Sequence, residues 1–163
     1  MSSNIKMDLL RWIDDPRRKT LILLGEWGFL KNRLIRRLAH GSNRVIVEAD
    51  LSKDGASALF EGEDASEMVK RLEKFTGKEI TADRSLLYLK GSQKCPELIE
   101  KLKFFSKDLP KLPIIVTGSH LEPLVKGLSD KEVTYLRYSP YSLNEFQGDI
   151  ENRRTMYRVK QED

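Results

Sequence analysis

The stretch LILLGEWGFLKNRLIRRLA, residues 21–39, holds the three parts of a strand–turn–helix unit. Four apolar residues come first, as in a strand that is buried on both faces. Gly25 and Gly28 follow and favour a turn. Leu30, Leu34 and Leu38 then repeat every four residues, which is the spacing of one face of a helix. This region therefore predicts a β-strand that leads directly into a basic helix.

The rest of the chain continues this alternation of apolar runs and helical patterns. The expected strands lie at residues 20–24, 44–48, 85–89, 113–117 and 133–137. The first four are nearly continuous apolar runs, so we expect them to be buried on both faces. Helical patterns lie at 7–13, 30–38, 65–75 and 96–106, and Asp64 is a candidate N-cap for the third. The pattern predicts an α/β fold with a mainly parallel sheet of about five strands and helices on both faces.

Two segments fall outside this pattern. Residues 52–63 are polar and contain glycines, so we expect a surface loop there. From residue 147 onwards the apolar pattern fades. The sequence thus predicts one domain over residues 1–147 and a polar tail over 148–163, either a frayed helix or the start of a linker.

The composition limits the class of protein. The chain has 163 residues, 39% hydrophobic and 33% charged, and a net charge of +4, which does not by itself argue for nucleic acid. No apolar run approaches the roughly 20 residues that a membrane span needs, so we expect no membrane contact. The single cysteine, Cys95, excludes an internal disulfide and fits a reducing compartment. We therefore expect a cytoplasmic protein.

Four landmarks in order resemble the ATPase domain of a group of prokaryotic AAA-type P-loop ATPases, in which a separate C-terminal region follows. They are LLRWIDDPRRKTLILLGEWGFLKNRLIRRLA at 9–39, SLLYLKGSQKCPELIEKLKFF at 85–105, LPIIVTGSHLEPL at 112–124 and SPYSLNEF at 139–146. The resemblance covers nearly all of residues 5–147. It implies a three-layer P-loop NTPase-like fold, with a Walker A loop after the first strand, a Walker B motif on the third and a sensor on the fourth.

The Walker A loop departs from its pattern at two positions. A P-loop reads G-x-x-x-x-G-K-[ST], and its backbone N–H groups wrap the phosphates. Residues 25–32 read GEWGFLKN, so Leu30 replaces the second glycine and Asn32 replaces the hydroxyl residue. If position 30 needs a positive φ, a leucine there costs about 1 kcal/mol or more. Gly28 is the alternative place for the turn, although it lies three residues before the lysine instead of one.

The resemblance assigns roles to two residues of this loop and leaves two aromatic residues unexplained. Lys31 matches the lysine that contacts the β- and γ-phosphates, or else it is one more cation on a basic helix. Asn32 falls where a hydroxyl would ligate Mg²⁺, and an amide oxygen is a poorer substitute in reach and geometry. Trp27 and Phe29 add bulk, and we expect them to fill the phosphate pocket rather than to stack on adenine.

The Walker B motif departs more completely. Where the family has Asp-Glu, to hold Mg²⁺ and to polarise the attacking water, this chain has Lys90 and Gly91. An ammonium group repels Mg²⁺, and glycine has no side chain with which to orient water. Gln93, which the family also has after this pair, can do neither task.

The sensor region and the histidines complete the candidate site. Thr117, Gly118 and Ser119 match the family's sensor. The resemblance implies that the hydroxyls of Thr117 and Ser119 face a γ-phosphate; the alternative is that the three residues form a capped strand-to-helix turn. His40 and His120 have no metal-ligand spacing with each other or with Cys95. We therefore expect no metal site and no catalytic residue.

Three functions remain open. The first is a pseudo-ATPase, either retained for its shape or redesigned at its nucleotide site, which acts as a binding module or scaffold for a protein partner or a missing C-terminal domain. The second is residual ATP or ADP binding, in which Lys90 contacts phosphate in place of Mg²⁺; the residues expected to bind are Gly25, Gly28, Lys31, Asn32, Thr117 and Ser119. The third is nucleic-acid binding through Arg17, Arg18, Lys19, Arg33, Arg36 and Arg37.

Overall fold

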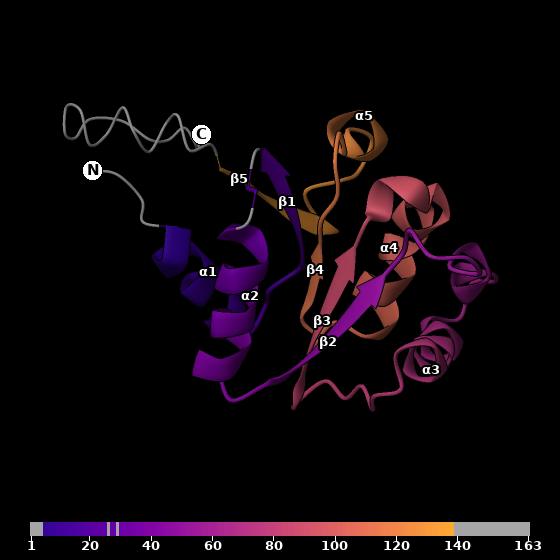
Figure 1. The fold of residues 1–163 in the computed structure, drawn as a ribbon, viewed down its shortest axis with the longest axis horizontal. Helices are drawn as coiled ribbons and strands as arrows, with labels where there is room; N and C mark the ends of the chain where they lie inside the picture. The colour runs from indigo at the N-terminus through magenta and orange to yellow at the C-terminus, as the bar shows by residue number, and fades with distance from the viewer. Residues whose placement is uncertain (1–4, 26, 29, 139–163) are drawn as a thin grey trace.

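A computed structural model describes residues 5–25, 27–28 and 30–138, and its centre is a five-stranded sheet (Figure 1). The strands are β1 (Thr20–Gly25), β2 (Val45–Asp50), β3 (Ser85–Lys90), β4 (Ile114–Val116) and β5 (Val133–Tyr138). Their order in the sheet is β2-β3-β4-β1-β5, and every neighbouring pair is parallel. The predicted α/β fold is confirmed, and the sheet is entirely parallel instead of mainly so.

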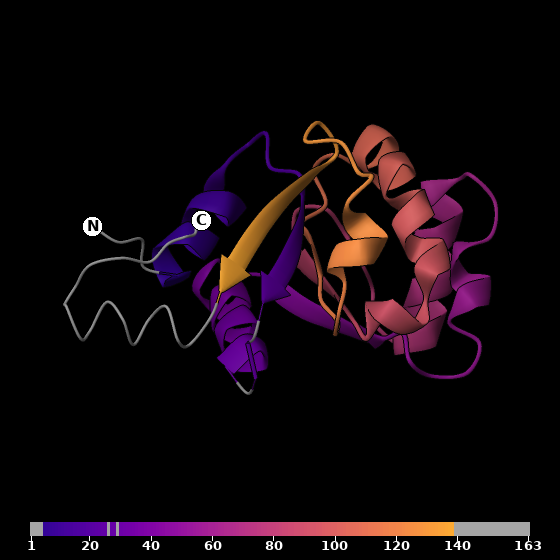
Figure 2. The same ribbon diagram turned by 90° about the horizontal axis from the view of Figure 1, so that it is seen from above.

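Helices cover both faces of the sheet (Figures 1 and 2). They are α1 (Ile5–Asp14), α2 (Leu30–Gly41), α3 (Ala65–Thr76), α4 (Pro96–Asp108) and α5 (Glu122–Val125), with 3₁₀ turns η1 (Ser57–Phe60) and η2 (Ser92–Lys94). The helices α1 and α2 pack on one face, and α3 and α4 pack on the other. Parallel strands need this covering because both of their faces carry apolar side chains.

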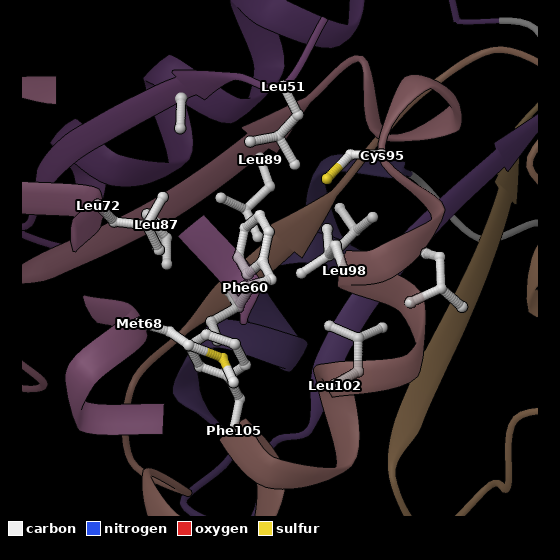
Figure 3. Close-up of a cluster of buried hydrophobic side chains, with 14 of the residues drawn as sticks. Leu51, Phe60, Met68, Leu72, Leu87, Leu89, Cys95, Leu98, Leu102 and Phe105 are labelled. Carbon is white, nitrogen blue, oxygen red and sulfur yellow. The ribbon is translucent and has the colours of Figure 1, made fainter. Parts of the chain in front are cut away.

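Two apolar clusters, one on each face, hold the layers together. Along β1, Leu21 and Leu23 join the cluster under α1 and α2, whereas Ile22 and Leu24 join the cluster under α3 and α4. This alternation follows from the two-residue period of a strand. Figure 3 shows the second cluster, where Phe60 and Phe105 are fully buried among the leucines of the sheet and of α4.

The strands begin within one residue of their predicted starts, and the predicted helix cap is present. The carboxylate of Asp64 accepts hydrogen bonds from the backbone N–H groups of Ser66 and Glu67, at 2.9 and 3.4 Å. Such a cap satisfies N–H groups that have no partner inside the helix.

Two predictions about burial were wrong. Strand β2 is not buried on both faces, because it lies at the edge of the sheet, and 57% of Val45 is exposed. Residues 52–63 are not wholly a surface loop, because η1 turns Leu59 and Phe60 into the core beside α3 and α4. Neither edge position nor a single turn of helix leaves a periodic pattern in the sequence.

Several predictions lie outside the described residues. These are the fourth landmark at 139–146, the domain boundary at 147, the tail at 148–163 and the role of Phe29. Within the described part of the chain, no helix combines the length and the apolar character needed to cross a membrane.

Candidate functional site

A cavity of about 570 Å³ lies at the carboxyl ends of β1, β4 and β5. Its lining residues are Leu23, Leu24, Gly25, Trp27, Gly28, Lys31, Thr117, Gly118, Ser119, His120, Leu121, Glu122 and Arg137. In open α/β sheets, ligands bind at this edge of the strands. Five of the six residues that the sequence predicted for nucleotide binding therefore line one cavity, and the sixth, Asn32, does not.

Gly25 and Gly28, in the turn between β1 and α2, are each required to be glycine for a different structural reason. Gly25 has φ = +99°, and a Cβ atom there would lie 2.0 Å from the carbonyl oxygen of Tyr138 on β5. Gly28 has φ = +54° and carries the left-handed turn before α2. Leu30 is the first residue of α2 and is not among the residues with positive φ. The turn is thus placed at Gly28, and the strain considered for a leucine at position 30 does not arise.

Lys31 is the candidate phosphate contact, and it stands half-buried in the cavity wall. None of the ion pairs between described residues includes it. Burial, and after it the charge of Lys90, lowers the pKa of Lys31 below its ordinary value. The cavity therefore contains a cation that lacks a carboxylate partner among the described residues, which is a setting that favours an anion.

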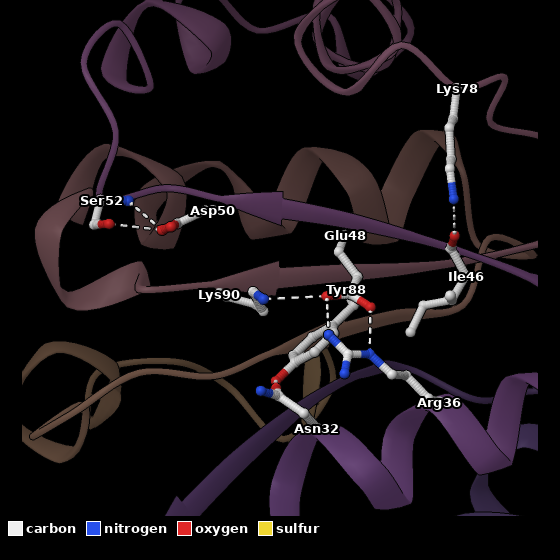
Figure 4. A network of polar contacts seen from close by, with 9 residues as sticks. All are labelled: Asn32, Arg36, Ile46, Glu48, Asp50, Ser52, Lys78, Tyr88 and Lys90. Carbon is white, nitrogen blue, oxygen red and sulfur yellow. Dashed lines mark hydrogen bonds and ion pairs between the residues drawn. The ribbon is translucent and has the colours of Figure 1, made fainter. Parts of the chain in front are cut away.

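Asn32 points away from this cavity and into the sheet. Its Oδ1 accepts a hydrogen bond from the hydroxyl of Tyr88 at 2.5 Å (Figure 4). Tyr88 is fully buried, and burial raises its pKa to about 12, so the phenol remains protonated and able to donate. The amide oxygen that the resemblance places near Mg²⁺ is thus engaged with a strand of the core.

Lys90, which the resemblance matches to the Walker B position, forms an ion pair with Glu48 on the neighbouring strand β2 (Figure 4). Its Nζ lies 3.1 Å from Glu48 Oε1, and Arg36 on α2 holds the same carboxylate with Nε and Nη2 at 2.7 and 2.9 Å. The hydrogen bond from Arg36, followed by that from Lys90, lowers the pKa of Glu48 to about 2. Two fixed cations therefore share one carboxylate at this edge of the sheet.

A neighbouring carboxylate, that of Asp50, is also engaged. Asp50 pairs in register with Lys90, and its Oδ1 accepts hydrogen bonds from the backbone N–H and the hydroxyl of Ser52, at 3.0 and 2.6 Å. Ser52 is the main reason why the pKa of Asp50 lies below its ordinary value. No group of three or more His, Cys, Asp or Glu side chains suited to a metal ion occurs among the described residues.

Gln93 has a role that its position in the sequence did not indicate. Its Oε1 accepts a hydrogen bond from the backbone N–H of Ser119 at 3.1 Å, and so connects η2 with the turn after β4. A Cβ atom on Gly118 would lie 2.5 Å from that same oxygen. Glycine at position 118 thus allows Gln93 to hold the sensor turn in place.

The other sensor residues differ in exposure. Thr117 is fully buried, next to Tyr88, and its hydroxyl makes no hydrogen bond of normal geometry to a described residue. Ser119 is exposed at the cavity, and so is His120, whose φ of +54° is unusual for a residue other than glycine. Such backbone conformations cluster at binding sites, where the surrounding structure holds them.

Trp27 is buried under the cavity. Its Nε1 donates to the carbonyl of Leu24 at 2.7 Å, and its ring lies 4.9 Å from that of Tyr138, measured between centroids. The indole packs with the core under α1 and α2. Since the cavity remains beside it, Trp27 forms part of the wall and does not fill the whole space.

Three of the six residues that the sequence offered for nucleic-acid binding are engaged within the protein. Arg18 donates to the carbonyls of Ile13 and Lys111, at 3.1 and 2.6 Å. Lys19 donates to the carbonyl of Asp130 at 2.6 Å, and Arg36 is held by Glu48. These contacts connect separate segments of the chain and therefore have a structural role.

The strand order, the turn into α2 and the cavity at the carboxyl ends of the strands are those of a P-loop NTPase-like α/β fold. A chain in a structure of Drosophila ORC bound to AT-rich DNA and Cdc6 is similar to this one, with a TM-score of 0.50 and 16% sequence identity. The match covers 90% of this chain and 30% of that one. A likeness at this identity concerns the fold alone.

No protein-family model matches the chain, and no curated protein matches it in sequence.

Proposed function

We propose that this domain is a non-hydrolysing binding module built on an AAA-like fold. The observation that carries the proposal is the carboxylate of Glu48, shared between Lys90 and Arg36 where the family resemblance expects the magnesium-binding carboxylate. A divalent cation placed there would face two fixed positive charges at short range. The residues at this position therefore do not fit Mg²⁺, and no hydrolytic step through the metal is derived.

The other expected contributors to hydrolysis support the same proposal. Gly91, with φ = +66°, has no side chain with which to orient water. The amide oxygen of Asn32 is held by Tyr88, and the carboxylate of Asp50 is held by Ser52. Asn32 Oδ1 and Asp50 Oδ1 thus already have partners within the protein.

The test is ATP turnover with Mg²⁺. We expect release of phosphate no faster than from a Lys31→Gln variant of the same preparation, because neither the metal nor the attacking water has a ligand. Turnover at a rate usual for ATPases, about 1 per second or faster, and lost in the Lys31→Gln variant, would refute the proposal.

A second candidate is binding of a nucleotide or another phosphorylated ligand without metal. The specific observation that favours it is the cavity of about 570 Å³ with Lys31 in its wall. Burial, and after it the charge of Lys90, lowers the pKa of Lys31. A bound anion would offset both the burial of this ammonium group and its repulsion by Lys90. The N-terminus of α2 adds N–H groups that favour an anion at the same place.

A thermal-shift titration with ATP, with and without Mg²⁺, tests this candidate. A ligand at 100 times its dissociation constant adds about 2.7 kcal/mol to the free energy of unfolding. We expect a shift that is independent of Mg²⁺ and is lost in the Lys31→Gln variant. The matched control is Lys74→Gln, which removes the same charge from an exposed position on α3. The absence of any shift with the unaltered protein would remove this candidate.

We also propose what kind of partner the binding module has. The similar chain comes from an assembly of ORC, Cdc6 and DNA, and a protein partner or a further domain is the counterpart we propose for this chain. Nucleic acid is less favoured, because only Arg17, Arg33 and Arg37 of the six basic residues have no partner described above. If the domain bound DNA through phosphate contacts, its affinity would fall steeply with added salt.

A further inference from the structure

A second cavity, of about 350 Å³, lies at the amino ends of β1 and β4, the edge of the sheet opposite the first cavity. Three separate segments form it: the loop between α1 and β1, the end of α4 with the loop that follows, and the loop before β5. Its lining residues are Pro16, Arg17, Arg18, Lys19, Thr20, Phe105, Ser106, Leu109, Pro110, Lys111, Leu112 and Lys131. It shares no lining residue with the cavity that contains Lys31.

The charge of this lining has one sign. Five of its residues are basic, namely Arg17, Arg18, Lys19, Lys111 and Lys131, and none is acidic. None of these five takes part in an ion pair between described residues. Arg18 and Lys19 donate to backbone carbonyls, which satisfy hydrogen bonds but do not cancel a full charge. The cavity is therefore a concave surface whose charged lining residues are all basic.

Arg18 is the most enclosed of these cations. Its Nε is buried and has no hydrogen-bond acceptor among the described residues. Burial, and after it the charge of Arg44, lowers the pKa of Arg18, whereas Asp15 and Asp14 act in the opposite direction as smaller causes. Burial is thus the main influence on this guanidinium, and charges of both signs lie near it.

We propose that this cavity binds a compact phosphorylated small molecule. Arginine and lysine side chains that converge from three segments are suited to the oxygens of a phosphate group. The volume is at the lower end of the range for small-molecule pockets. Phe105, Leu109 and Leu112 supply an apolar wall for the body of the ligand. This binding site is separate from the cavity with Lys31 at the opposite edge of the sheet, and the proposal does not depend on the function proposed above.

The probe is inorganic pyrophosphate, titrated calorimetrically into the protein at low salt. The test variant is Lys111→Gln with Lys131→Gln, two exposed positions at which substitution leaves the core unaltered. The matched control is Lys74→Gln with Lys94→Gln, two exposed lysines that do not line the cavity. We expect the affinity for pyrophosphate to fall about tenfold or more in the test variant and to stay unchanged in the control.

Two further arms identify the place and the source of the phosphate. The variant Lys31→Gln must leave pyrophosphate binding intact, because it alters only the first cavity; loss of binding in this variant would assign pyrophosphate to that cavity and overturn the proposal. The oligonucleotide dT10 tests nucleic acid as the source. Binding of dT10 but not of pyrophosphate, equal losses in the test and control variants, or no binding of pyrophosphate by the unaltered protein would each overturn it as well.

Discussion

At the scale of single residues, Glu48 determines what the carboxyl ends of β2 and β3 can bind. Its carboxylate forms ion pairs with both Lys90 and Arg36. The two cations, which would otherwise repel each other, are therefore stabilised without a metal ion. This is why a lysine can stand at the end of β3, where the family that the sequence resembles has a carboxylate. The same contacts make Glu48 the residue at which the account is easiest to test.

We expect Glu48→Gln to lower the free energy of unfolding by about 1–2 kcal/mol at neutral pH, because it leaves two cations side by side. The pKa of Glu48 is lowered in the folded state from 4.5 to about 2, so its contribution is complete above pH 4.5 and is lost as the pH falls towards 2. The measurement is urea unfolding of the unaltered protein and of Glu48→Gln, at neutral pH and near pH 2. We expect the difference between their free energies of unfolding to become smaller near pH 2.

Glu67→Gln is the control for this prediction. The carboxylate of Glu67 lies 3.4 Å from Lys70 Nζ in an exposed pair, so we expect a change of no more than about 0.5 kcal/mol. If the difference in free energy of unfolding between the unaltered protein and Glu48→Gln were the same near pH 2 as at neutral pH, the role given to the carboxylate would be contradicted.

The sequence revealed which residues depart from the family pattern, but not what compensates for them. Lys90 and Leu30 can be recognised directly, since each lies within a short motif. Glu48 lies 42 positions before Lys90, and the two meet only because β2 and β3 are neighbours in register. Strand order and register are tertiary properties, so the ion pair could not be read from spacing along the chain.

At the scale of elements, the turn between β1 and α2 depends on close packing against β5. Gly25→Ala would place a Cβ atom 2.0 Å from the Tyr138 carbonyl oxygen at a residue with φ = +99°. We expect a loss of about 3 kcal/mol or more in urea unfolding, because the backbone of β5 must move.

Gly28→Ala is the matched variant in the same turn. Gly28 also has a positive φ, but a Cβ atom there meets no described atom within 4 Å. We expect it to cost only about 1 kcal/mol, the conformational term alone. Losses of equal size in the two variants would show that the contact with β5 does not matter.

Most of the elements could be predicted because their signals are local. Apolar runs located the strands, and leucine spacing located α2. The turn η1 was missed, although it buries Phe60, because four residues are too short for a helical period. Five of the six residues predicted for nucleotide binding line one cavity. The cavity at the amino ends of β1 and β4 was not predicted, since segments that are far apart in the sequence form it.

At the scale of the whole molecule, one sheet serves two apolar clusters, so neither face can lose its helices without exposing the sheet. Trp12 and Trp27 both belong to the cluster under α1 and α2. Tryptophan fluorescence therefore reports that face, whereas far-ultraviolet circular dichroism reports all the helices. We expect the two unfolding curves in urea to coincide, as for a two-state domain. Separate midpoints would show that the two faces unfold independently.

The proposed function also concerns the whole molecule: we propose that a P-loop NTPase-like fold acts here as a binding module that holds no metal ion. Calorimetric titration with ATP, once with Mg²⁺ and once with EDTA, tests that claim most directly. We expect the same result in both, either equal affinity or no binding, because the carboxylate of Glu48 is shared between two cations and the amide oxygen of Asn32 is held by Tyr88. Binding about tenfold or more tighter with Mg²⁺, and abolished by Lys31→Gln, would contradict it.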